Sequence, residues 1–395
     1  MHSDAPFKVA DTINKFRHKL NPDKISHDQH KVMNQMSACR TPAMGINLAY
    51  CPECGKQHLF YKSCRNRHCN VCGGQKRDVW IAKRKADALP VDYFHIVFTV
   101  PEYLNATFRH NSAVMFNILF KCSWETICHF ASQHKHLGAK TGMTALLHTW
   151  GQNLAYHPHL HCLVPCGGIT PQNKWRNAKT NGKYIFPVKA LSVVFREKFI
   201  DELISLQKSN SIVLEHPIDP KNIFNHPLYK NKWVVYAKLP ANGGEQIVEY
   251  IARYSHKVAI SNSRILNINN DNVTFSWFDY RKSKPDIMTL NGEEFLRRFL
   301  MHTLPQKFVK IRHYGILCCR NKDKYIELVH HFYGLTKPAS IKGLSNKELL
   351  TLLYGKSPHL CPNCKNGELV FQCNTNYQRG PPDCQIMPYN DFNFQ

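Results

Sequence analysis

Three Cys-x-x-Cys pairs are the feature that most constrains how this chain can fold. Cys51–Cys54 and Cys69–Cys72 are separated by 14 residues, and a third pair, Cys361–Cys364, lies near the C-terminus. Two knuckles at the first spacing can supply four thiolates to one tetrahedral zinc ion. In a long chain that begins without an export signal, such pairs indicate metal binding rather than disulfides. We therefore expect a zinc module over residues 39–77.

The expected zinc ligands are Cys51, Cys54, Cys69 and Cys72. Three side chains between the pairs could replace one of these ligands, namely His58, Cys64 and His68. The third pair has no clear partner pair, and the candidates are Cys318, Cys319, Cys373 and Cys384. A second zinc in the tail is therefore left open by the sequence.

The charge balance points to a polyanionic partner. The chain has 52 lysines and arginines against 28 acidic residues, a formal net charge of +24. Nucleic acid is the usual partner for such an excess, because neutralising phosphates releases condensed counterions. Within the zinc module, Arg65 and Arg67 are the best candidates for DNA contact. No stretch is apolar enough to span a membrane, so we expect a soluble, cytoplasmic protein that associates with the nucleoid through DNA.

Helical and strand-like segments alternate through the middle of the chain. The pattern predicts helices over 5–38 and 104–137, and strands over 93–100, 158–164 and 233–237. This order favours an α/β or α+β core. We divide the chain into a helical lead-in (1–38), the zinc module (39–77), a catalytic domain (78–320) and a C-terminal tail that holds the third cysteine pair (321–395).

A histidine pair lies on one of the expected strands. Alternation along residues 158–164 places His159 and His161 on one face, and the apolar Leu160 between them on the other. Two imidazoles on one face can bind a divalent ion such as Mg²⁺ or Mn²⁺, which would polarise a phosphodiester. A second triplet, His134-Lys135-His136, has a lysine at its centre, which cannot turn towards a sheet core. The third ligand stays open among Gln152, His157 and His256.

Two tyrosines follow on an expected helix over residues 244–255. Tyr250 and Tyr254 share one face of this helix, so both hydroxyls can reach the same cleft. A phenol becomes an effective nucleophile when a cation polarises its target, and Arg253 or Lys257 could stabilise the phenolate. Attack on phosphorus would give a covalent phosphotyrosine. Two tyrosines permit two successive transesterifications in one site.

Four motifs, taken in this order, resemble the rolling-circle insertion-sequence transposases of the HUH class, of the IS-ninety-one type. They are Ser63-Cys-Arg-Asn-Arg-His-Cys69, His95-Ile-Val-Phe-Thr-Val-Pro101, His157-Pro-His-Leu-His-Cys-Leu-Val-Pro165 and Tyr250-Ile-Ala-Arg-Tyr254-Ser-His-Lys257. The likeness covers residues from about 30 to 320.

The resemblance implies a fold, a reaction and a set of site residues. It implies an α+β core with a central antiparallel sheet flanked by helices, preceded by a zinc-binding, DNA-binding module. His159 and His161 match the metal histidines of the class, and Tyr250 and Tyr254 match its tyrosine motif. By the same resemblance, the protein would nick and join single-stranded DNA at element ends through a 5′-phosphotyrosine.

Two other interpretations remain at this point. A replication initiator or a conjugative relaxase uses the same histidine and tyrosine chemistry, but the early zinc module and the absence of a helicase segment favour a transposase. A zinc-dependent DNA-binding protein without catalysis would retain its activity when Tyr250 and Tyr254 are replaced by phenylalanine. The sequence shows neither the terminal DNA sequences recognised nor any protein partner.

Overall fold

A five-stranded antiparallel sheet lies at the centre of the computed structural model, which describes residues 5–179, 185–238, 258–280, 282–318, 320, 322–336 and 341–374. The order of its strands is β12 (Ile311–Gly315), β4 (Gly142–Trp150), β5 (Tyr156–Pro165), β3 (Tyr93–Thr99) and β8 (Val234–Lys238). All four neighbouring pairs are antiparallel. The expected α+β fold, with its central antiparallel sheet and flanking helices, is confirmed.

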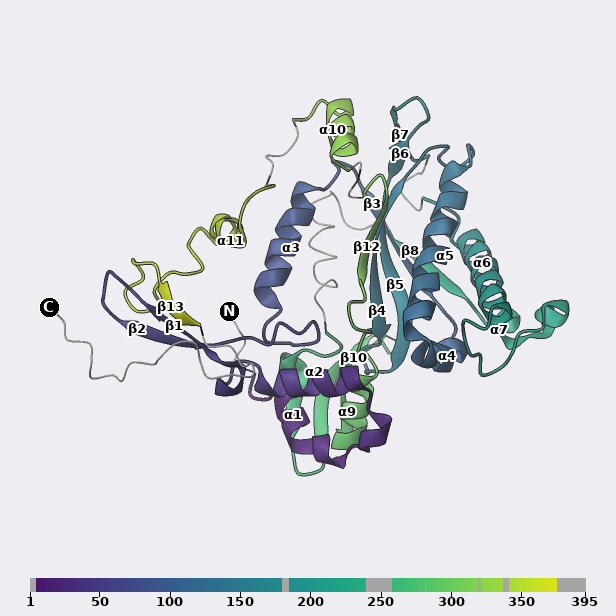
Figure 1. The fold of residues 1–395 in the computed structure, drawn as a ribbon. Coiled ribbons are helices and arrows are strands. Elements are labelled where there is room, and N and C mark those ends of the chain that lie inside the picture. The colour runs from purple at the N-terminus through teal and green to yellow at the C-terminus, as the bar shows by residue number, and fades with distance from the viewer. Residues whose placement is uncertain are drawn as a thin grey trace.

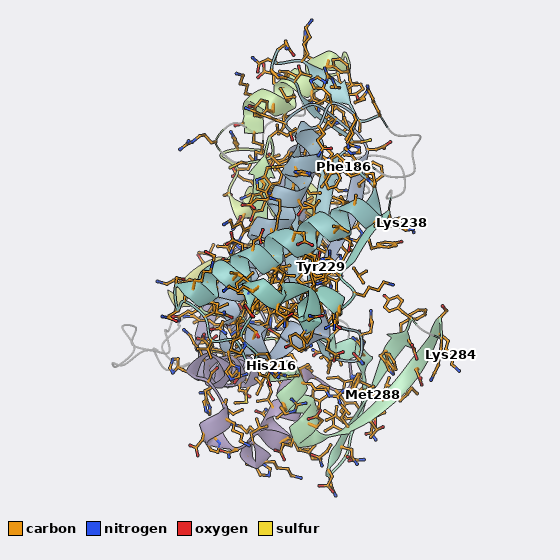
Figure 2. The ribbon with its side chains drawn as sticks, turned by 90° about the vertical axis from the view of Figure 1, so that its right-hand side faces the viewer. Phe186, His216, Tyr229, Lys238, Lys284 and Met288 are labelled. Atoms are coloured by element: carbon orange, nitrogen blue, oxygen red, sulfur yellow. The ribbon has the colours of Figure 1, made fainter. Side chains whose placement is uncertain are left out.

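Helices cover one face of this sheet (Figure 1). They are α4 (Asn105–His110), α5 (Ser112–Ser132) and α6 (Val188–Lys208). The sheet residues that alternation directs towards the helices are apolar and fully buried, such as Phe98, Leu160 and Cys162. Figure 2 looks onto this helical layer, with Phe186 and Tyr229 beside α6. The residues that alternate with these along the strands point to the opposite face of the sheet, and they include His159 and His161.

Two further helices cover part of the histidine face. Helix α3 (Gly74–Ala86) lies between the sheet and the cysteine-rich part of the chain, and α10 (Lys322–Phe332) lies beside its upper end (Figure 1). The Arg84 guanidinium of α3 lies 3.2 Å from His313 Nε2 on β12, and it pairs with Asp87 at 2.7 Å. Trp80 of α3 packs against an apolar cluster that includes Leu163 of β5.

The N-terminal helices do not form a bundle of their own. Helices α1 (Val9–Phe16) and α2 (His27–Ala38) share one core with β9 (Ile265–Ile268), β10 (Asn272–Asp279), β11 (Lys284–Asn291) and α9 (Gly292–Leu300). Phe16 is fully buried against Gly292, where a Cβ atom would lie 2.3 Å from the ring. The β10–β11 hairpin projects from this core, with Lys284 and Met288 along β11 (Figure 2). The sequence predicted the helices, but it did not predict that they pack on β9–β11 and α9.

A small three-stranded sheet joins the two ends of the chain. Its order is β13 (Val370–Asn374), β1 (Ile46–Tyr50) and β2 (Gln57–Tyr61), and both pairings are antiparallel. Helix α11 (Asn346–Tyr354) packs on α3, where the Tyr354 hydroxyl donates to the Asp78 carboxylate. The residues after α10 therefore return to the cysteine-rich module (Figure 1).

The remaining elements are short. They are β6 (Gly167–Ile169), β7 (Trp175–Asn177), α7 (Pro227–Lys230) and six 3₁₀ turns at Arg17–Lys19, Pro22–Lys24, Pro42–Met44, Glu102–Leu104, Pro220–Asn225 and Asn262–Arg264. Among the helices in the described part of the chain, none has both the length and the apolar character needed to cross a bilayer.

Candidate functional site

Three histidines meet on the face of the central sheet opposite to α5 and α6. His159 and His161 lie on β5, and His148 lies on β4 directly opposite His159. One ring nitrogen from each of the three lies within 4.8 Å of the others, and the Nε2 atoms of His159 and His161 are 3.2 Å apart. Two ligands that bind one octahedral ion at right angles are about 3 Å apart when each bond is about 2.1 Å. The spacing therefore fits a shared divalent ion.

The other ring nitrogen of each β5 histidine is already occupied. His159 Nδ1 donates to the carbonyl oxygen of His157 at 2.6 Å, and His161 Nδ1 lies 2.8 Å from His95 Nε2 on β3. A hydrogen bond donated by Nδ1 fixes the tautomer in which Nε2 carries the lone pair that binds a metal. Both histidines are thus oriented with Nε2 towards the same point.

Burial favours the neutral form of His159 and of the neighbouring His95. It lowers the pKa of each to about 4. His148 and His161 are only 3% and 8% exposed, whereas His159 keeps partial contact with solvent. A neutral imidazole is the form that binds a metal ion, so His159 can bind one at neutral pH.

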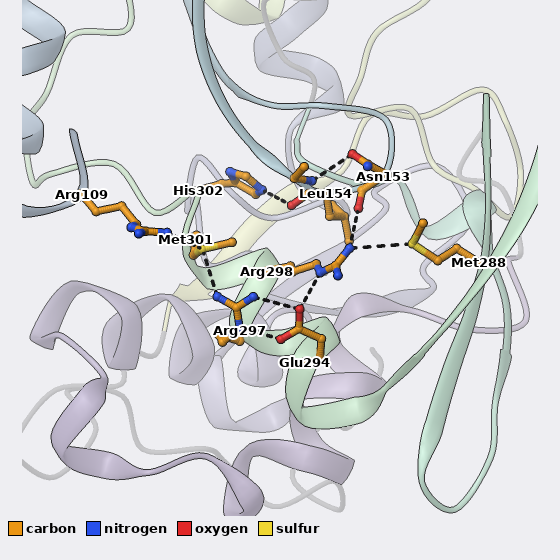
Figure 3. Close-up of polar contacts among 10 residues, drawn as sticks. Arg109, Asn153, Leu154, Met288, Glu294, Arg297, Arg298, Met301 and His302 are labelled. Atoms are coloured by element: carbon orange, nitrogen blue, oxygen red, sulfur yellow. Dashed lines mark hydrogen bonds and ion pairs between the residues drawn. The ribbon is translucent and has the colours of Figure 1, made fainter. Parts of the chain in front are cut away.

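The loop between β4 and β5 is held by polar contacts from α9 and the residues after it (Figure 3). Arg298 donates to the carbonyl oxygen of Asn153, and His302 lies 3.3 Å from the carbonyl oxygen of Leu154. Glu294 fixes the Arg298 guanidinium at 2.7 Å. Bonds from Arg297 and then Arg298 lower the pKa of Glu294 to about 2. The two strands that carry the triad are therefore tied to the N-terminal core.

The cysteines form two separate clusters. Cys39, Cys64, Cys69 and Cys72 make the first, and Cys51, Cys54, Cys361 and Cys364 make the second, with all sulfur atoms of each cluster within 4.8 Å of one another. In the first cluster the Sγ atoms of Cys64 and Cys72 lie 3.6 Å apart, and so do those of Cys39 and Cys69. Four sulfurs around one zinc at about 2.3 Å are about 3.8 Å apart, so the first cluster has the dimensions of a zinc site.

This grouping corrects the predicted set of Cys51, Cys54, Cys69 and Cys72. The first pair lies in the turn between β1 and β2, whereas Cys64 follows the far end of β2, next to Cys39. A strand of five residues is about 16 Å long, so the two ends of the hairpin cannot share one ion. The 14-residue spacing is typical of a zinc ribbon. Here strand β2 lies within that spacing and carries the chain away from the first pair.

Comparisons with known proteins agree with this arrangement. A family model described as "Transposase zinc-binding domain" matches residues 8–100, and one described as "Putative transposase" matches residues 142–324. A protein of Sinorhizobium fredii named "Putative transposase y4qJ" is 37% identical over 390 residues, which are 95% of this chain and 98% of that protein. The chain belongs to the IS91-type Y2 transposases. The "Transposase for insertion sequence element IS801" of Pseudomonas savastanoi pv. phaseolicola is 24% identical over 92% of this chain and 88% of its own length.

The third histidine of this transposase was missed from the sequence. His148 takes the place for which Gln152, His157 and His256 were considered, because the strand that carries it, β4, was not expected. The alternation of Ala145, Leu147 and Thr149 with Leu146 and His148 was the available signal. His157 instead contributes its backbone carbonyl to His159, and His256 lies outside the described residues.

The tyrosine segment of the transposase also lies outside the described residues. The four site residues predicted in this segment, Tyr250, Arg253, Tyr254 and Lys257, are therefore not described. Of the two predicted DNA contacts in the zinc module, Arg65 is exposed, with a left-handed backbone at φ 52° directly after Cys64. Arg67 donates to the carbonyl oxygen of Phe308. The structure thus gives Arg67 a partner within the protein.

Proposed function

We propose that this transposase nicks and joins single-stranded DNA at element ends through a 5′-phosphotyrosine intermediate. The observation that carries the proposal is the convergence of His148, His159 and His161 with two Nε2 atoms 3.2 Å apart. Such a site binds a divalent ion, and Tyr250 and Tyr254 are the proposed nucleophiles. The first tyrosine opens a strand and the second permits another transfer in the same site.

The three histidines would hold the ion, and the donor set favours Mn²⁺ over Mg²⁺. All three donors are imidazole nitrogens, whereas Mg²⁺ prefers oxygen ligands. When bound there, the ion would polarise the phosphoryl oxygen of the scissile bond. His95 and the carbonyl of His157 would keep the two β5 imidazoles aligned, and the buried surroundings would keep His159 neutral.

The proposed step exchanges one phosphodiester for another. The tyrosine oxygen bonds to phosphorus, the bond from phosphorus to the 3′ oxygen breaks, and that oxygen takes up a proton and leaves as a 3′ hydroxyl. The tyrosine loses its proton in the same step, so no net proton, electron or nucleotide is consumed. Reversal at a different 3′ hydroxyl joins the strand elsewhere.

The neighbourhood of β8 supports this assignment of the tyrosines. Val97 of β3 pairs with His161 on one side and with Tyr236 of β8 on the other. Neighbouring strands are about 4.8 Å apart, so the backbone of Tyr236 is about 10 Å from that of His161. The chain leaves β8 at Lys238 (Figure 2), twelve residues before Tyr250. That length is ample to return a side chain to the triad.

The zinc module would bind DNA beside this centre. Cys39, Cys64, Cys69 and Cys72 are the proposed ligands of its structural zinc, which agrees with the zinc-binding domain matched over residues 8–100. Arg65 is the proposed phosphate contact of the module, while Arg253 and Lys257 would approach the strand at the tyrosines. The net charge of +24 supports a nucleic-acid partner.

The test is adduct formation on a single-stranded oligonucleotide that carries the cognate element end. With Mn²⁺, the wild-type protein should form an adduct that survives denaturation, and a label at the 3′ end of the oligonucleotide, downstream of the nick, should stay with the protein. The Tyr250→Phe, Tyr254→Phe double variant should form none. An adduct that persists in the double variant would refute the proposed nucleophiles.

A matched control separates chemistry from folding. Tyr280 is exposed near the end of β10, away from the triad strands, so Tyr280→Phe should form the adduct as wild type does. Binding of the oligonucleotide by the double variant, without adduct, would show that the fold and the DNA site are intact. Full transposition by the double variant would favour the alternative hypothesis of a zinc-dependent DNA-binding protein without catalysis.

A further inference from the structure

The second cysteine cluster joins parts of the chain that lie 300 residues apart. Cys51 Sγ is 3.6 Å from Cys364 Sγ, and Cys54 Sγ is 3.8 Å from Cys361 Sγ. A disulfide requires about 2.0 Å, so these are four free thiols. Sulfurs that share one tetrahedral zinc are about 3.8 Å apart. The distances fit a zinc ion and do not fit a covalent bridge.

The two knuckles have the same internal geometry. Each begins with Cys-Pro and closes with a backbone hydrogen bond, from Gly55 N to Cys51 O at 2.8 Å and from Lys365 N to Cys361 O at 3.0 Å. The residue after the second cysteine is left-handed in both, at φ 66° for Gly55 and φ 60° for Lys365. A lysine adopts this conformation only where its surroundings impose it. Two matched knuckles facing each other are the arrangement of a zinc ribbon.

Hydrogen-bond donors lie beside the sulfurs of this cluster. The Gly367 amide donates to Cys364 Sγ at 3.5 Å, and the Asn363 side-chain amide donates to Cys54 Sγ at 3.7 Å. His58 Nε2 lies 3.3 Å from Cys361 Sγ and can donate to it. These donors stabilise negative charge on sulfur, which is the form that binds zinc.

Gly367 leaves the space that the cluster needs. A Cβ atom at this position would lie 2.6 Å from Cys51 Sγ and 2.6 Å from Glu53 Cγ. Cys361 N donates to the carbonyl oxygen of Gly367, and Cys51 N donates to that of Lys56 at the matching place in the other knuckle. The close approach of the two knuckles therefore depends on a glycine at 367.

We propose that Cys51, Cys54, Cys361 and Cys364 bind a second structural zinc, which fastens the C-terminal segment 341–374 to the N-terminal module. Half of this ligand set lies outside the zinc-binding domain matched over residues 8–100. The ion completes a unit in which β13 pairs with β1 and α11 packs on α3. The N-terminal module is thus completed only by residues more than 300 positions later in the chain. Sequence reasoning offered Cys318, Cys319, Cys373 and Cys384 as partners of the third pair, and this ligand set uses none of them.

The test counts thiolate-bound metal in the full-length protein. Reconstitution with Co²⁺ gives charge-transfer bands that report cysteine ligands, and imidazole sites such as the histidine triad lack these bands. The Cys361→Ser, Cys364→Ser double variant should lose about half of the wild-type band intensity and one equivalent of zinc per chain. Cys318→Ser is the matched control, because Cys318 is exposed and outside both clusters. Unchanged zinc content and band intensity in the double variant would overturn the proposal.

A second pair of variants leaves all sixteen cysteines in place. Gly367→Ala should lower the zinc affinity of one of the two cysteine sites, seen as faster loss of one equivalent to a chelator. Gly74→Ala is the control, since a Cβ atom there meets no atom within 4 Å. Retention of the other equivalent shows that the protein is folded. Equal loss rates for both glycine variants would contradict the second site, and neither result depends on phosphotyrosine chemistry.

Discussion

His95 Nε2 lies 2.8 Å from His161 Nδ1, and the two imidazole rings are nearly parallel, at 7°. If His161 binds a metal ion through Nε2, its Nδ1 carries the proton and His95 accepts it. His95 lies on β3, one strand away from the triad, and is 5% exposed. In the proposed site it would therefore be a positioning residue, acting on a bound ion through His161.

Removing this hydrogen bond should weaken metal binding more than folding. We expect His95→Phe to lower the affinity for Mn²⁺ about 10- to 100-fold, the usual effect of losing a partner of a metal ligand. His95→Gln keeps an acceptor for the His161 proton and should recover part of the affinity. Titration of the metal-free protein with Mn²⁺ measures both. Equal affinities for the two variants would show that His95 only fills space.

His148 should be indispensable, whereas the residues first considered for its place should not. His148→Ala removes one of three imidazoles, so Mn²⁺ affinity and adduct formation should both fall at least as far as they do in His159→Ala. Gln152→Ala is the matched control, because Gln152 lies in the loop after β4, where its carbonyl oxygen accepts a hydrogen bond from Arg264. The same metal titration distinguishes the two outcomes. A Gln152 variant that loses the metal while His148→Ala keeps it would reverse the assignment.

The sequence was sufficient for the features that depend on local pattern. Period-two alternation correctly separated His159 and His161 from Leu160, which the structure buries completely on the opposite face. The cysteine pairs correctly indicated that cysteine sulfurs gather in clusters. In both cases the information lies within a few residues, where strand periodicity and knuckle spacing determine which side chains meet.

The features that depend on pairing between distant segments could not be predicted from local sequence patterns. Cys39 and Cys64 stand alone in the sequence, and they join Cys69 and Cys72 only because the β1–β2 hairpin returns the chain to its start. The partner of Cys51 lies more than 300 residues away. His148 likewise enters the triad through the β4–β5 pairing. One sequence shows the members of each cluster but not the register that assembles them.

The contact between Phe16 and Gly292 should make the N-terminal helices sensitive to one methyl group. A Cβ atom on Gly292 would lie within 2.3 Å of the fully buried ring, so Gly292→Ala forces α1 and α9 apart. Overpacking of this kind costs about 1–3 kcal/mol of unfolding free energy. Urea unfolding at constant pH measures the loss. Gly74→Ala adds a methyl group in open space at the first residue of α3, so it should not lower the midpoint. A Gly292→Ala variant as stable as wild type would mean that this core is loosely packed.

Acid should destabilise the protein through His302, which supports the β4–β5 loop. His302 is 2% exposed and lies close to Thr149 Oγ1 and the carbonyl oxygen of Leu154. Burial lowers its pKa to about 4, against about 6.5 in an unfolded chain. Because the folded pKa is depressed, the stabilising contribution is complete above pH 6.5. It is lost as the pH falls from 6.5 towards 4, at up to about 1.4 kcal/mol per pH unit.

The His302→Gln variant isolates this contribution. An amide can still donate to the Leu154 carbonyl but takes up no proton in this range, so the unfolding free energy of the variant should depend less steeply on pH between 6.5 and 4. Denaturant unfolding across that range, in the metal-free protein, gives the slope as a number of protons, and the difference from wild type should approach one. His110→Gln, at an exposed position on α4, should leave the slope unchanged. Parallel curves for wild type and His302→Gln would mean that His302 is already protonated in the fold, and that the Leu154 carbonyl holds an imidazolium.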